Sequence, residues 1–114
     1  MPYIQARLSV NTDDTQKENL QTKLSKAVSA SLSKPSAYIM TEIQDNCNLY
    51  MAERKLDKCA YISISSLGSI SKNSCQTLTK AICDILQNDF EINAQNVYIT
   101  YHPTDLWGWN NMMF

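Results

Sequence analysis

The sequence lacks an excess of charge of either sign. Its 10 lysines and arginines are nearly balanced by 11 aspartates and glutamates, and no block of like charges forms a tail. A protein that binds nucleic acid or a membrane surface through bulk electrostatic attraction needs a strongly positive balance. The composition therefore argues against both of these functional classes.

A targeting segment and a membrane span are also missing. The N-terminus has no basic segment followed by an apolar one, and no apolar run approaches the roughly 20 residues that cross a bilayer. We therefore expect a cytoplasmic protein. The sequence leaves open secretion without a signal peptide.

Few side chains are available for a metal ion. Cys47, Cys59, Cys75 and Cys83 form no C-x-x-C pair, and His102 is the only histidine. Cys75 and Cys83 are expected on one helix, where their separation of about 12 Å is too long for a disulfide. We predict four reduced thiols, no metal site and no cofactor.

The first half of the chain reads as strand, helix, strand. Residues 3–10 and 37–43 alternate apolar and polar positions, as strands with one buried face do. Thr15 to Glu18 resembles a capping box before a helix that Pro35 ends at or before the preceding residue. The apolar stripe of this helix comprises Leu20, Leu24, Ala27, Val28 and Leu32. Residues 45–58 suit a short edge strand near 49–51 and a charged loop over 53–58.

The second half repeats this order. A strand over residues 59–67 is followed by a turn at 68–71 and a helix capped by Asn73 or Ser74. The helix is predicted from apolar residues at i, i+3, i+4, i+7 and i+8, namely Leu78, Ala81, Ile82, Ile85 and Leu86. A fourth strand is expected over 96–101, and residues 103–114 form a loop with a short terminal strand.

Two strand–helix–strand units with right-handed crossovers can share one sheet. We predict an α+β fold, a four-stranded mixed sheet with two helices on one face, in one domain over residues 1–114. The opposite face carries aromatic and small polar residues. A symmetric homo-oligomer would cover that face and enlarge a modest core.

Met1-Pro2 offers a candidate base. If Met1 is removed, Pro2 becomes an N-terminal secondary amine, and an apolar pocket lowers the pKa of such a group from near neutrality. A neutral amine there can act as a general base. If Met1 stays, the nitrogen is an amide without basicity. Alone, the dipeptide is also an ordinary way to begin a protein.

Five short segments, taken in order, match one family. They are Met1-Pro2, Ser33-Lys34-Pro35 through Tyr38-Ile39, Ser66-Leu67-Gly68-Ser69-Ile70, Val97-Tyr98-Ile99, and Gly108-Trp109-Asn110-Asn111 with Phe114. Each segment is weak alone, but their order and spacing are specific. Over essentially its full length the chain resembles the macrophage migration inhibitory factor family of the tautomerase superfamily.

The resemblance implies a homotrimer with an isomerase site at each subunit interface, a keto–enol tautomerase of the phenylpyruvate or dopachrome type. Pro2 would be the catalytic base, Lys34 would bind the substrate's carboxylate, and the Leu67 backbone N–H would hold its polar end. Tyr98 would come from the neighbouring subunit. The resemblance also gives pocket walls, namely Tyr3, Tyr38, Thr100, Trp107, Trp109 and Phe114.

These assignments have alternatives. Lys34 could be a cation that favours a helix C-terminus, and Tyr98 and Trp109 could be ordinary interface aromatics. His102 matches no functional position and is taken as a loop residue. At the level of the molecule, the alternatives are a secreted cytokine that acts on a cell-surface receptor, with a vestigial pocket, and a purely structural trimer.

The chain also departs from the family. Thr100 replaces an asparagine near the substrate's ring, which leaves substrate preference open. The segment 102–106 is short and Trp107 replaces a smaller aliphatic residue, so we expect a narrower pocket mouth. Cys59-Ala60-Tyr61-Ile62 lacks the second cysteine of the family's C-x-x-C segment. We therefore do not expect thiol–disulfide activity.

Overall fold

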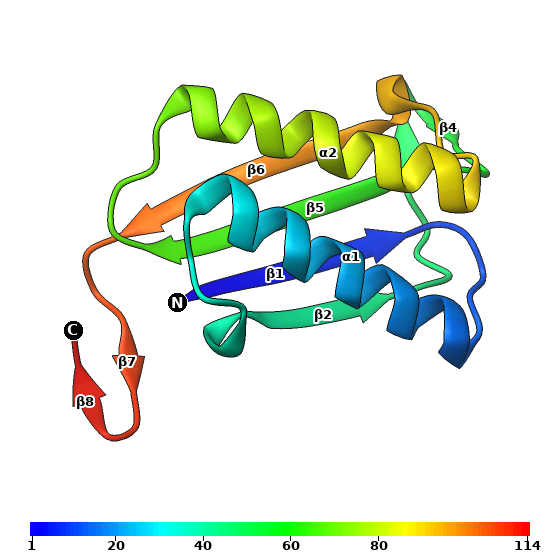
Figure 1. The fold of residues 1–114 in the computed structure, drawn as a ribbon. Coiled ribbons are helices and arrows are strands. Elements are labelled where there is room, and N and C mark those ends of the chain that lie inside the picture. Colours follow the sequence, from blue (N-terminus) through cyan, green and yellow to red (C-terminus); the bar gives the residue numbers. More distant parts are fainter.

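The fold is a four-stranded mixed sheet with both helices on one face (Figure 1). The computed structural model describes residues 1–114. Strand β1 (Pro2–Leu8) pairs parallel with β2 (Met40–Gln44) and antiparallel with β5 (Ala60–Leu67). Strand β5 pairs parallel with β6 (Val97–Thr104), which gives the order β2-β1-β5-β6. The predicted fold class is confirmed.

Both helices begin at caps other than the predicted ones. Helix α1 (Asp14–Leu32) is capped by Asp13, which forms a reciprocal capping box with Gln16. Asp13-x-x-Gln16 has the same pattern as the predicted Thr15-x-x-Glu18, so the two frames compete. Asp45 favours the earlier frame, because its carboxylate accepts from both Thr12 N and Thr12 Oγ1 at 2.9 Å and holds the chain just before Asp13.

Helix α2 (Lys72–Phe90) is capped by Ser71, neither by Asn73 nor by Ser74. The Ser71 hydroxyl accepts from Ser74 N at 3.1 Å, so Ser74 is the residue that receives the cap. Both Cys75 and Cys83 lie on this helix as predicted, and all four cysteines are unpaired. Neither helix is long and apolar enough to cross a membrane.

Several short elements differ from the prediction. Residues 36–38 form a 3₁₀ turn, η1 (Ser36–Tyr38), because Tyr38 N donates to Pro35 O at 3.1 Å, and the strand starts only at Met40. Strands β3 (Tyr50–Met51) and β4 (Arg54–Lys55) form a separate hairpin, where an edge strand and a charged loop were expected. Strands β7 (Gly108–Trp109) and β8 (Met112–Met113) form a C-terminal hairpin.

Two strands also have shifted ends. Strand β1 ends at Leu8, before the predicted Val10, where the chain bends towards α1. A second 3₁₀ turn, η2 (Ala94–Asn96), leads into β6, which continues to Thr104. His102 therefore lies on a strand, and its prediction as a loop residue was wrong. Its backbone pairs with that of Ser65, which extends the sheet beyond the β-branched run that the sequence showed.

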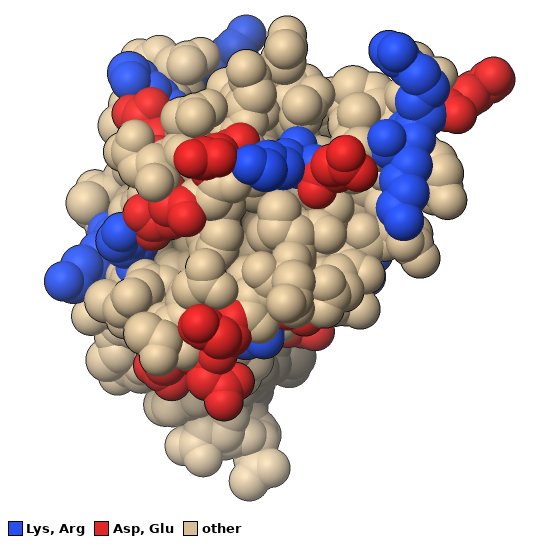
Figure 2. Space-filling model, turned by 90° about the vertical axis from the view of Figure 1, so that its right-hand side faces the viewer, with Lys and Arg blue, Asp and Glu red and all other residues tan.

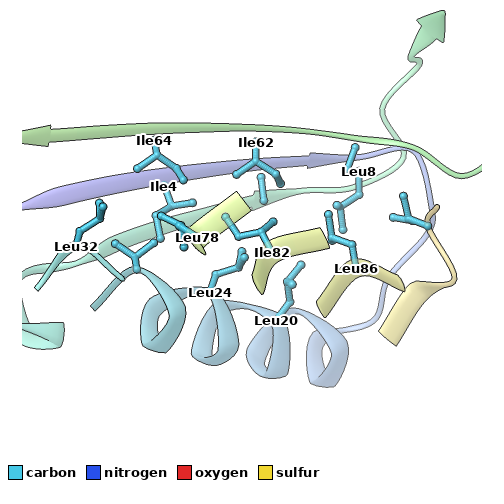
Figure 3. Close-up of a cluster of buried hydrophobic side chains, with 14 residues drawn as sticks. Ile4, Leu8, Leu20, Leu24, Leu32, Ile62, Ile64, Leu78, Ile82 and Leu86 are labelled. Atoms are coloured by element: carbon cyan, nitrogen blue, oxygen red, sulfur yellow. The ribbon is translucent and has the colours of Figure 1, made fainter. Parts of the chain in front are cut away.

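The core lies between the sheet and the helices. Figure 3 shows side chains of both helices and of β1 and β5 pointing towards one another. The fully buried members include Ile4, Leu8, Leu20, Leu24, Val28, Ile62, Ile64, Leu78, Ile82 and Leu86. Burial of each such aliphatic side chain stabilises the fold by about 1.5–3 kcal/mol. The predicted apolar faces are confirmed, with Ala27 and Ile85 packed at their margins.

No helix covers the other face of the sheet (Figure 1). The strand register places its side chains in rows that run across β2, β1, β5 and β6. These rows are Met40, Tyr3, Ser65 and His102, then Glu42, Gln5, Ser63 and Thr100, then Gln44, Arg7, Tyr61 and Tyr98. This open face is polar and aromatic, as predicted. Charges elsewhere are mixed, and Figure 2 shows acidic and basic side chains interspersed over one side of the molecule.

Candidate active site

Pro2 lies fully buried at the first position of β1, beside a pocket of about 920 Å³. We call this the Pro2 pocket. Among the predicted residues, Pro2, Tyr3, Tyr38, Trp107 and Trp109 line it. The chain thus brings together both of its termini and the turn after α1.

Lys34 and Leu67 meet at the same end of the sheet. The Lys34 ammonium donates to the Leu67 carbonyl at 3.0 Å, and the Leu67 N–H donates to the Met1 carbonyl at 3.3 Å. Lys34 reaches this position because α1 ends in a left-handed residue, Ser33, with φ 54°. Its ammonium therefore bonds across the fold to β5. This contact places the Lys34 ammonium at the end of β5.

The electrostatic environment at this end of β1 disfavours positive charge. Burial, and secondly the charge of Lys34, lower the pKa of the Met1 amino group. That amine stands one residue ahead of the Pro2 nitrogen.

The C-terminal hairpin forms an aromatic wall. Tyr38 meets Trp109 edge to face at a ring-centroid distance of 5.7 Å, and Trp109 meets Phe114 at 6.2 Å. The Phe114 N–H donates to the Trp107 carbonyl at 2.9 Å, which closes the hairpin. Phe114 thus contacts Trp109 but does not line the Pro2 pocket itself, whereas the family resemblance predicted it as a pocket wall.

Tyr3 lines the Pro2 pocket, and its hydroxyl is engaged in a hydrogen bond. Its hydroxyl donates to the Glu42 carboxylate, and the same carboxylate oxygen accepts from Gln5 Nε2 at 3.4 Å. The hydrogen bond to Glu42 raises the pKa of Tyr3. This hydroxyl is therefore held on the open face and is not free for acid–base chemistry.

Tyr98 and Thr100 lie away from the Pro2 pocket in their own chain. Tyr98 pairs with Tyr61, and Tyr61 pairs with Arg7 on β1. Arg7 lies about 17 Å from Pro2 along β1, at a rise of about 3.4 Å per residue. Tyr98 is 64% exposed and lines a second pocket of about 330 Å³ beside the β3–β4 hairpin. One chain alone does not bring these two predicted residues to the site.

A hydrogen-bonded row joins Thr100 to its neighbours. The Thr100 hydroxyl lies 2.8 Å from the Tyr61 hydroxyl and 2.9 Å from His102 Nε2. All three side chains are on the open face of the sheet. Thr100 is thus already paired within its own chain, which limits what its hydroxyl can offer to a substrate.

The sequence reasoning missed several pocket residues, namely Ala37, Ile39, Met40, Ser65 and Gly108. Strand alternation was the available signal for Met40 and Ser65, because it places them, like Tyr3, opposite the apolar positions of their strands; their pairing with Tyr3 comes from the structure. Ser66 was also missed as a side chain. It is fully buried, its hydroxyl has no hydrogen-bond partner, and it pairs with Pro2. A buried polar group left unpaired costs about 1–3 kcal/mol.

Comparison with known proteins is consistent with this geometry. The family model described as Macrophage migration inhibitory factor (MIF) matches residues 1–113. The macrophage migration inhibitory factor of Xenopus laevis is 31% identical over 116 residues, which cover 100% of this chain and 99% of that protein.

Solved structures share the fold. Leishmania major MIF2 superposes with a TM-score of 0.91 at 26% identity, covering 100% of this chain and 97% of that one. A fused 4-OT protein, described as a symmetric trimer, superposes with a TM-score of 0.84 at 14% identity and covers 97% of this chain and 94% of that one.

Proposed function

The chain belongs to the macrophage migration inhibitory factor family, and from that premise we propose that it is a keto–enol tautomerase that uses the Pro2 amine as its base. The superfamily includes isomerases. The activity on an arylpyruvate, of the phenylpyruvate or dopachrome type, is our proposal for this chain.

One observation carries the proposal. The Met1 carbonyl occupies the Leu67 N–H, which is the group expected to hold the substrate's polar end. Removal of Met1 frees this N–H and converts the Pro2 amide into a secondary amine. The same cleavage therefore creates both the base and an oxygen-binding donor, next to the Lys34 ammonium.

The proposed reaction is a proton transfer between carbon and oxygen of one substrate. Lys34 binds the carboxylate, and the aromatic ring lies against Tyr38 and Trp109. The neutral Pro2 amine removes a proton from the carbon next to the carbonyl and returns one to the enol. Lys34 also helps keep Pro2 neutral, because a nearby like charge disfavours protonation.

Assembly is part of the proposal. We infer a homotrimer in which Tyr98 of one subunit completes the Pro2 pocket of the next. Its exposure of 64%, its distance from Pro2 within one chain and the uncovered sheet face support this arrangement. In a closed ring of three identical subunits, each subunit also covers the open face of its neighbour, so no subunit is left with an unpaired interface.

The test compares three proteins in an enol–keto assay. These are the protein with Met1 verified as removed, the Pro2→Gly variant, and a form with one extra residue ahead of Pro2. We expect activity in the first and a loss of roughly 100-fold or more in the other two, the usual range for general base catalysis. Equal rates in all three would exclude Pro2 as the base.

A further inference from the structure

We propose that Ser66 is the positioning residue of the Pro2 amine, with its hydroxyl accepting a hydrogen bond from the ring nitrogen, directly or through one bound water. This inference rests on the proposed function, because it needs Pro2 to be N-terminal. It assigns a role to a side chain that the reaction described above does not use.

The first observation is an unpaired hydroxyl. Ser66 Oγ is the single buried side-chain oxygen or nitrogen without a hydrogen-bond partner, and the residue is 0% exposed. Its side chain lies on the same face of β5 as Ile62 and Ile64. Alanine would fill such a position without leaving a polar group unsatisfied. A serine there indicates a partner that is absent while Met1 is in place.

The second observation is the identity of the neighbouring residues. Ser66 pairs with Pro2 on β1 and with Pro103 on β6, so it is flanked by prolines on both sides. Neither proline has a backbone N–H to offer as long as its nitrogen is an amide. Removal of Met1 changes this for Pro2 alone, whose ring nitrogen then carries an N–H.

The register makes the approach close. Because Leu67 N–H donates to the Met1 carbonyl, Pro2 and Ser66 form a non-hydrogen-bonded antiparallel pair. In such pairs the Cα atoms are about 4.5 Å apart and the side chains are closest. Both side chains of this pair are buried on the helix-covered face.

The chemistry of the two groups is complementary. A neutral secondary amine has one N–H and one lone pair, and its protonated form has two N–H groups. If the N–H is directed to Ser66 Oγ, the lone pair points into the Pro2 pocket. The bond strengthens when the amine is protonated, because charge-assisted hydrogen bonds are stronger than neutral ones. Ser66 thus stabilises the state in which Pro2 holds the substrate's proton.

A stability comparison tests the proposal without any substrate. Ser66→Ala is measured in two backgrounds, the processed protein and the form with an extra residue ahead of Pro2. We expect Tm to fall in the processed protein, where a hydrogen bond is lost, and to rise in the extended form, where an unpaired hydroxyl is removed. A shift of the same sign in both backgrounds would overturn the proposal.

Ser63→Ala is the matched control, since Ser63 is on the same strand but on the open face. It should shift Tm equally in both backgrounds. A different response of Ser63→Ala in the two backgrounds would show that the extension acts generally on β5 and would overturn the assignment to Ser66.

A second measurement follows the amine itself. NMR titration of Pro2 in the processed protein should show a lower Pro2 pKa in Ser66→Ala, with Ser66→Cys in between. The acid limb of kcat/KM should move to lower pH, and kcat should fall roughly 10- to 100-fold, as expected for a misplaced base. An unchanged Pro2 titration in Ser66→Ala would overturn the role of Ser66. An inactive processed wild type would instead overturn the tautomerase, while the titration would still decide on Ser66.

Discussion

Lys34 shows how position decides the role of a single residue. From the sequence without the family resemblance, a lysine just after a helix is better explained as a helix-terminal cation than as a carboxylate ligand. The left-handed Ser33 turns the chain so that the Lys34 ammonium reaches the Leu67 carbonyl, 33 residues away in sequence. No sequence pattern encodes that reach, because it depends on where the fold places the residues after α1 relative to the end of β5.

We therefore expect Lys34→Ala to weaken substrate binding. A hydrogen bond to a charged group contributes about 1.5–3 kcal/mol, so KM for a carboxylate substrate should rise roughly 10- to 100-fold. The matched control is a ketone substrate without a carboxylate, whose KM should change little. An unchanged KM for the carboxylate substrate would contradict this role.

Asp45 is expected to make stability depend on pH. Hydrogen bonds from the Thr12 N–H and hydroxyl, together with Lys17, hold the pKa of Asp45 below its usual range. A lowered folded-state pKa means that this stabilisation is present above the unfolded pKa, near 3.9, and is lost as pH falls through the folded value. Asp45→Asn should thus be less stable than wild type at pH 7.

Urea unfolding at several pH values checks this expectation. The stability difference between wild type and Asp45→Asn should shrink as the pH falls below about 4. The exposed Asp105, which has no hydrogen-bond partner for its carboxylate, supplies the control variant Asp105→Asn. A difference that stays constant down to low pH would show that the Asp45 carboxylate is not the titrating group.

At the scale of elements, periodicity predicts position better than it predicts boundaries. The apolar spacing of α2 and the alternation of β1 and β5 are confirmed because burial of one face decides them. A helix cap depends on single hydrogen bonds, and several nearby residues are of the preferred types, such as Asp13 and Thr15 at the start of α1. The choice between Asp13 and Thr15 comes from a contact outside the helix, that of Asp45 with Thr12.

The cap of α2 provides a direct test at this scale. Ser71→Ala removes the acceptor for the Ser74 N–H and should cost about 0.5–2 kcal/mol in the free energy of unfolding. Asn73→Ala, inside the first turn, should cost nothing or stabilise slightly, since alanine favours helix more than asparagine does. Denaturant unfolding of both variants measures this. The reverse order would restore Asn73 as the cap.

The sequence also contained a signal for Ser66 that single-residue reasoning overlooked. Ser66 continues the buried alternation of Ala60, Ile62 and Ile64, so a polar side chain falls on the apolar face. That its hydroxyl has no hydrogen-bond partner is visible only in the structure. The neighbours of Ser66 depend on the strand register, and the sequence predicts the fold class but not the register.

At the scale of the whole molecule, the proposed site extends beyond one chain. Within one chain, Lys34 and Pro2 lie at the same end of the sheet, because Leu67 bonds to both Lys34 and Met1, whereas Tyr98 lies at the other end. The resemblance to the family predicts a shared site, but periodicity does not, because in the proposed trimer Tyr98 acts on another copy of the chain. Molar mass in solution tests the proposed trimer, and an active monomer would contradict the shared site.

Mixed assemblies test the sharing itself. Pro2→Gly and Tyr98→Ala subunits, each inactive alone, should regain activity when unfolded together in equal amounts and reassembled. A site then has an intact Pro2 and an intact Tyr98 in about a quarter of cases under random cyclic assembly. Activity measured against subunit ratio checks this figure. No recovery in mixtures shown by mass to contain both subunits would place Tyr98 outside the neighbouring site.

The central position of β1 has a consequence for the timing of synthesis. Its two partners, β2 and β5, begin at Met40 and Ala60, so the first strand to leave the ribosome has nothing to pair with until much of the chain has followed. At about 5–20 residues per second, this leaves the N-terminus unpaired for several seconds. During this interval the Met1 carbonyl is free of Leu67, so the proposed removal of Met1 can take place before the N-terminus is paired in the sheet.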